Sequence, residues 1–100
     1  MTSDTKFNEA VTRLFPTLKQ YVPIVERVHG EHHPEFHEVR AIFNALVEKT
    51  EAASSNRPEL NEEFSKLREI TADYTIPDDV CESYEAVYNM LSELDKAHSA

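Results

Sequence analysis

The hydrophobic residues in the first third of the chain recur at alternating steps of four and three, an uninterrupted heptad pattern. They are Phe7, Val11, Leu14, Leu18, Tyr21, Val25 and Val28. This spacing places apolar side chains along one face of an α-helix. Because the pattern continues through Pro16 and Pro23, each of which removes a helical hydrogen bond, it predicts one bent helix over residues 4–28. Gly30 is expected to end this helix as a left-handed C-cap.

Three more amphipathic segments follow, separated by polar or proline-containing breaks. They predict helices over residues 34–53, 58–73 and 78–97. Pro34 suits the first turn of the second helix, Asn56 the cap of the third, and Asp78 or Asp79 the cap of the fourth. Four such stripes with short connections indicate an all-α, up-down-up-down four-helix bundle, with residues 1–100 as one domain. A coiled-coil dimer is the alternative, although internal prolines and short linkers disfavour long rods.

Composition and charge narrow the classes of partner. The chain carries 10 basic and 19 acidic residues, a net charge of −9, with one Gly and one Cys. An acidic surface repels nucleic-acid phosphates and anionic lipid. A single Gly excludes a Gly-rich phosphate loop, and a single Cys excludes an internal disulfide. With no apolar run near the ~18 residues of a membrane span, and no signal peptide, we expect a cytoplasmic protein without enzymatic activity that binds neither nucleic acid nor membrane.

The highest concentration of potential metal-binding side chains is a histidine cluster at the predicted turn between the first two helices. Four of the five histidines lie there: His29, His32, His33 and His37. His33 and His37 are four residues apart and would share a helical face, while His29 lies across the Gly30 turn. Imidazole suits iron, zinc, copper or nickel, so His29, His33 and His37 are candidate metal ligands. The alternative is a solvated turn whose histidines titrate individually.

Cys81 and His98 are the other residues with chemical potential. Cys81 lies near the predicted start of the fourth helix with no histidine close in sequence, so we interpret it as a packed or partly exposed thiol. His98 is expected in a solvated C-terminal tail, with a ligand role inside a bundle as the alternative. No Ser-His-Asp arrangement stands out. The sequence therefore offers the histidine cluster as its main candidate site.

Two segments together resemble a known family. One is Val25-Glu26-Arg27-Val28-His29-Gly30-Glu31-His32-His33-Pro34-Glu35; the other is Leu67-Arg68-Glu69-Ile70-Thr71, Tyr74-Thr75-Ile76-Pro77, Cys81 and Tyr84 through Tyr88-Asn89. Both resemble the hemerythrin-like domain of the iron–sulfur cluster repair proteins, di-iron proteins that respond to nitrosative and oxidative stress. The resemblance implies a four-helix bundle and a role in stress response or iron handling. In that family, His and Glu from all four helices hold two bridged irons.

Only part of the family's ligand pattern is present. The resemblance makes His29 a metal ligand, but Asn8 stands where a histidine is expected in the first helix, and Asn56-Arg57 replace a Glu-His pair. Residues 48–57 contain no histidine, and the final His-x3-Glu would fall after Ala100. Inward-facing Asn8 is a further oxygen donor to consider, as are the carboxylates of Glu48, Glu51, Glu62 and Glu63.

The family resemblance and the missing ligands together lead to two hypotheses. In the first, the chain is a hemerythrin-like protein that binds metal, with iron as the candidate, through His29, His33 and His37. In the second, it is a metal-free bundle that acts as a regulatory module by contacting a protein partner or by forming a homodimer. The second is motivated by the missing ligands and by predicted helix seams that are almost entirely apolar.

Overall fold

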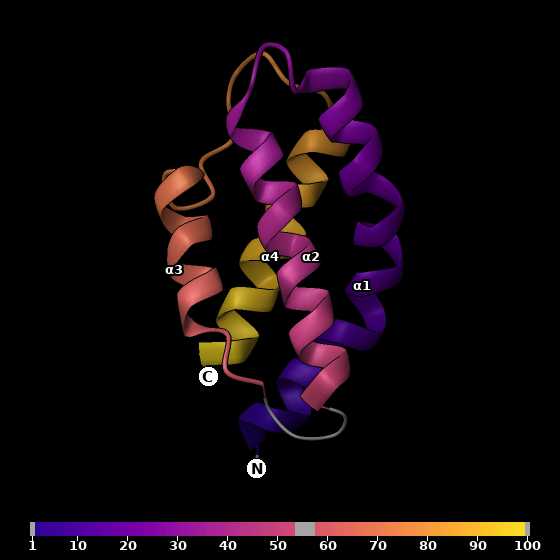
Figure 1. Cartoon of the computed structure of the whole chain (residues 1–100), viewed down its shortest axis with the longest axis vertical. Helices are drawn as coiled ribbons and strands as arrows, with labels where there is room; N and C mark the ends of the chain where they lie inside the picture. The colour runs from indigo at the N-terminus through magenta and orange to yellow at the C-terminus, as the bar shows by residue number, and fades with distance from the viewer. Residues whose placement is uncertain (1, 54–57, 100) are drawn as a thin grey trace.

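The computed structural model describes residues 2–53 and 58–99, and its regular structure is entirely helical. The helices are α1 (Thr2–His29), α2 (Glu35–Ala53), α3 (Asn61–Ile70) and α4 (Glu82–Ser99). No strand occurs among the described residues, which confirms the all-α class. The helices lie side by side, with the 30–34 turn at one end and the start of α1 toward the other (Figure 1). The segment after α3 begins at the side of the bundle and rises to the end where the 30–34 turn lies.

The first helix follows the predicted seam at its start and departs from it at its end. Pro16 and Pro23 both lie inside the continuous α1. Phe7, Leu14 and Leu18 are buried, as are Ala10, Phe15 and Val22 outside the seam, whereas Val28 is 59% exposed. An α-helix drifts about 20° per heptad relative to a 3.5-residue repeat, or roughly 60° over three heptads. The strict heptad extrapolation was therefore wrong at Val28.

The expected left-handed cap at Gly30 is also wrong. Gly30 has no positive φ, and its N–H donates to the Glu26 carbonyl at 2.8 Å, which continues the helical pattern. A Cβ at this position would lie 2.5 Å from that carbonyl oxygen and 2.8 Å from the His37 ring. Gly30 thus leaves room for the close approach of His37 to the end of α1.

The third helix ends earlier than its hydrophobic pattern predicts. It stops at Ile70, and the left-handed residues of the chain follow, with φ of 51° at Ala72, 60° at Asp73 and 64° at Tyr74. The Thr71 hydroxyl donates to the Leu67 carbonyl and accepts the N–H of Tyr74 at 2.8 Å. The helix that was expected to reach residue 73 is therefore replaced by a side-chain-braced turn.

The fourth helix begins later than predicted, at Glu82 and not at residue 78. Its first turn is closed by the N–H of Glu85, which donates to the Cys81 carbonyl at 3.1 Å. Asp78 and Asp79, the expected caps, lie in a turn that ends before this helix begins. The third helix begins at Asn61 without a side-chain cap, and the expected cap Asn56 lies outside the described residues.

Apolar side chains from all four helices form one core. α1 packs along α4 and α2, and α2 packs against α3. The largest side chains that are essentially inaccessible include Tyr84, Tyr88, Phe7, Phe36, Phe64 and Leu18. Burying one such side chain contributes about 1.5–3 kcal/mol. The core therefore combines large aromatic rings with a greater number of aliphatic side chains.

His98 belongs to this core and not to a solvated tail, so that expectation was wrong. It is only 3% exposed. Its ring centroid lies 5.2 Å from that of Phe7 and 5.3 Å from that of Phe64, and its Nε2 lies 3.0 Å from the Pro58 carbonyl oxygen. The helical period carries the last turn of α4 back onto the bundle, which explains the burial.

Candidate functional site

The histidine cluster is held in place by the tight turn that joins α1 to α2. His29 is the last residue of α1, His33 lies within the turn, and His37 lies in the first turn of α2. The N–H of His33 donates to the His29 carbonyl at 2.8 Å. The backbone therefore brings His29 and His33 to the same end of the bundle, with ring centroids 6.4 Å apart.

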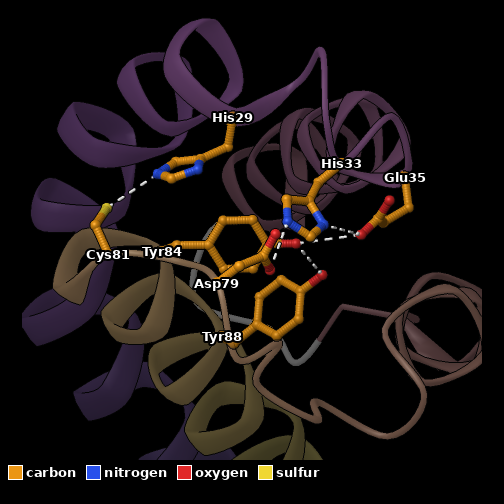
Figure 2. Close-up of polar contacts among 7 residues, drawn as sticks. All are labelled: His29, His33, Glu35, Asp79, Cys81, Tyr84 and Tyr88. Atoms are coloured by element: carbon orange, nitrogen blue, oxygen red, sulfur yellow. Dashed lines mark hydrogen bonds and ion pairs between the residues drawn. The ribbon is translucent and has the colours of Figure 1, made fainter.

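His29 faces a partner that is distant in sequence. Its Nε2 lies 3.1 Å from the Sγ of Cys81, which is exposed at the start of α4 (Figure 2). The His29 ring also meets Tyr84 edge-on, with centroids 5.4 Å apart. This pair could not be found from sequence spacing, because it forms only when the 71–81 segment returns to the end of α1.

His33 lies between two carboxylates. Its Nδ1 is 3.1 Å from Glu35, and its Nε2 is 3.1 Å from Asp79 (Figure 2). Its side chain is only 14% exposed, whereas that of Asp79 is 71% exposed. These two contacts tie the interhelical turn to the 71–81 segment.

A buried pair of phenols lies beneath these histidines. The hydroxyls of Tyr84 and Tyr88 are 2.9 Å apart, and Tyr84 donates to Glu35 over 3.4 Å. Phe36 completes the layer, with its ring centroid 5.1 Å from that of Tyr84. Burial raises the pKa of both phenols, and for Tyr84 the hydrogen bond with Tyr88 adds to the effect. Both therefore stay neutral and hydrogen-bonded at neutral pH.

His37 pairs with Glu26 and not with the other two predicted ligands. Its Nδ1 lies 2.8 Å from the Glu26 carboxylate, and its side chain is 58% exposed. Arg40 pairs with the same carboxylate. The hydrogen bonds from His37 and Arg40 hold the pKa of the Glu26 carboxyl below its usual range. His37 thus belongs to a surface cluster that fastens α2 to α1.

The other candidate donors are dispersed. Asn8, considered as an inward-facing ligand, is exposed, and so are Glu48, Glu51 and Glu62. Glu63 is partly buried and pairs with Lys49 at 2.7 Å. Within residues 2–53 and 58–99, no three His, Cys, Asp or Glu side chains are arranged to hold a metal ion. The described residues therefore do not fit the di-iron cage that the family resemblance implies.

Comparisons with protein-family models, curated proteins and solved structures found no match to this chain. None of the helices in the described part of the chain combines the length and apolar character needed to cross a membrane. The observations that bear on function are therefore the packed aromatic interior, the His29–Cys81 and His33 contacts at one end, and the distribution of charge and exposed apolar residues.

Proposed function

We propose that this chain is a hemerythrin-like protein, related to the di-iron proteins of iron–sulfur cluster repair, that acts through protein contacts without a di-iron centre. The proposed topology is the up-down-up-down bundle of that family. The proposed role is a non-enzymatic regulatory module, with a second copy or another protein as its partner. The segments around His29-Gly30 and from Tyr74 to Cys81 carry the resemblance to the family.

The filling of the bundle interior is the observation that carries this proposal. A di-iron centre of this family needs His and Glu side chains directed inward from all four helices. Among the described residues, the buried polar or charged ones are Thr71, Asp95 and His98. Each already makes a hydrogen bond with the protein. Phe36, Tyr84 and the remaining core rings occupy interior volume that a metal cage would require.

An exposed apolar pair on α1 supports a role in protein contacts. Ile24 is 41% exposed and Val28 is 59% exposed, and the two are four residues apart. This spacing places them on neighbouring turns of one helical face. Contact with another protein would remove this apolar area from water at about 25 cal/mol per Å². The face adjoins the end of the bundle where His29 and Cys81 meet.

Light scattering coupled to size-exclusion chromatography, over a range of protein concentrations, tests this proposal. The wild-type chain is expected to associate with itself, or to capture a partner in a pull-down, and Ile24→Lys is expected to abolish that association. Asn8→Lys is the matched control, because it adds the same charge at an exposed position of α1 that lies on nearly the opposite side of the helix from Ile24. A strictly monomeric wild-type chain that captures the same proteins as Ile24→Lys would contradict the proposal.

A second candidate function is binding of a transition metal at the histidine end. It is favoured by the 3.1 Å contact between His29 Nε2 and Cys81 Sγ, since imidazole and thiolate are both ligands of zinc and iron. His33 would complete the site only by leaving Glu35 and Asp79 and approaching His29. This candidate keeps two of the three histidines predicted from the sequence.

Titration with Co²⁺ separates the second candidate from the first. A bound thiolate gives a charge-transfer absorption in the near ultraviolet, which Cys81→Ser is expected to remove. His37→Gln is expected to leave that absorption unchanged, because His37 faces Glu26. The absence of any saturable Co²⁺ spectrum in the wild-type chain would contradict metal binding at this end.

A further inference from the structure

A second polar cluster lies away from the histidines, between the end of α3 and the last turns of α4. There a cleft of about 440 Å³ opens to solvent. Its lining includes two cationic side chains, Arg68 and Lys96, and two hydroxyl side chains, Ser92 and Ser99. Ser92, Lys96 and Ser99 are spaced by four and three residues, so they share one face of α4.

Asp95 forms the floor of this cleft. It is 5% exposed, and a buried carboxylate is costly unless it is paired and hydrogen-bonded. The Tyr74 hydroxyl donates to its Oδ2 at 2.8 Å. Arg68 Nη1 lies 3.1 Å from Oδ1 and 3.3 Å from Oδ2. Both oxygens of Asp95 are therefore engaged, and its charge is balanced by Arg68.

The turn after α3 brings Tyr74 over Asp95. Ala72, Asp73 and Tyr74 all have left-handed φ values, which residues other than glycine rarely adopt. Burial and the hydrogen bond with Asp95 raise the pKa of Tyr74, so its hydroxyl keeps the proton that it donates. The turn thus fixes one wall of the cleft.

The Asp95 contact uses only one of the three nitrogens of Arg68. A guanidinium carries five N–H donors in a planar fork that matches carboxylate and phosphate oxygens. The Arg68 side chain is 44% exposed, which leaves its remaining donors accessible from the cleft. Lys96 is exposed and, in the described part of the chain, has no carboxylate within ion-pair distance.

We propose that this cleft binds a small oxyanion, a phosphate or carboxylate group, with Arg68 and Lys96 as its charged contacts. The hydroxyls of Ser92 and Ser99 are additional donors. Asp95 is a positioning residue, because it orients the Arg68 guanidinium without touching the anion. Asp73 lines the same cleft and opposes anion binding, so we expect affinity in roughly the millimolar range.

NMR titration of the full chain at pH 7 and constant ionic strength tests the proposal, with inorganic phosphate and acetate as separate probes and chloride as the reference salt. Saturable shifts are expected at the amides of Arg68, Tyr74 and the last two turns of α4. Saturation by phosphate alone, acetate alone or both supports the site and identifies the preferred group. Shifts identical to those in chloride, or no saturation with either probe, would overturn it.

Variants distinguish a built site from general surface charge. Lys96→Gln and Arg68→Gln are each expected to weaken binding at least tenfold, whereas Lys66→Gln, which removes an exposed charge outside the cleft, should leave it unchanged. Asp95→Asn is expected to weaken binding severalfold through the loss of Arg68 orientation. Arg68 and Asp95 pair with each other, so variants at either position can also destabilise the fold. Lys96 is exposed, so Lys96→Gln is the decisive variant. Unchanged affinity in Lys96→Gln would overturn the assignment.

Discussion

Tyr84 offers the sharpest perturbation of the aromatic interior. Its side chain is inaccessible to solvent, and its ring meets those of His29, His33, Phe36 and Tyr88. Tyr84→Ala removes the whole ring, whereas Tyr84→Phe removes only the hydroxyl. The two variants therefore separate the contribution of ring packing from that of the hydrogen bonds.

The expected magnitudes are well separated. Truncation of a buried aromatic side chain to Ala costs about 3–5 kcal/mol, because the cavity closes only in part. Loss of the hydroxyl breaks the 2.9 Å contact with Tyr88, which costs about 1–2 kcal/mol, including the phenol left unpaired. Since small domains are stable by about 5–15 kcal/mol, Tyr84→Ala should remove a large share of the total.

Urea denaturation followed by helical circular dichroism measures both effects. At a slope of about 1.5 kcal/mol per molar urea, a loss of 4 kcal/mol lowers the midpoint by roughly 2–3 M. Ser65→Ala, at an exposed position of α3, is the control and should stay within about 0.5 kcal/mol of wild type. If Tyr84→Ala costs no more than Tyr84→Phe, the ring does not support the core as described.

Three further predictions concern charge and packing. The pKa of Glu26 is depressed because its carboxylate accepts a hydrogen bond from His37. The stability that Glu26 adds is therefore present above about pH 4.5 and lost at lower pH. The difference in unfolding free energy between wild type and Glu26→Gln should shrink between about pH 5 and pH 3, and a constant difference would contradict this. Gly30→Ala should cost about 1–3 kcal/mol in urea denaturation, because its Cβ would lie 2.5 Å from the Glu26 carbonyl oxygen and 2.8 Å from the His37 ring. A neutral or stabilising result would refute this close packing. Because the pKa values of Tyr74 and Tyr84 are raised, the folded state loses stability as the pH rises above about 10. Tyrosinate absorbance at 295 nm should therefore reach the value for all four tyrosines only as the helical circular dichroism signal is lost. Ionisation of all four tyrosines in a chain that stays helical would contradict the burial of these two side chains.

The number of helices could be predicted from the apolar repeats in the sequence, but the residues at which some helices begin and end could not. The apolar repeats predicted four helices, and α2 begins at Glu35, one residue from the expected position. The end of α3 and the start of α4 depend on local hydrogen bonds, such as that between Thr71 and Leu67, which leave no periodic signal. His98 was expected in a solvated tail, yet it lies four residues after buried Leu94, so the apolar repeat of α4 already indicated that it faces the core.

The candidate site could likewise be predicted from the sequence only in part. Proximity of His29 and His33 follows from a turn that the sequence marks with Gly30 and Pro34. The direction of each imidazole is set by distant partners, Cys81 and Asp79. Spacing alone gave no sign of these contacts, since they connect residues on opposite sides of a loop whose path depends on tertiary packing.

The iron content of the purified chain tests the central claim most directly. The untagged protein would be produced in cells supplemented with iron and zinc, and metal per chain would be measured by elemental analysis together with the absorption spectrum. A folded helical protein with iron far below one atom per chain, and without oxo-bridge bands, is the predicted result. About two irons per chain with those bands would mean that its side chains rearrange into a working di-iron centre, which would contradict the account.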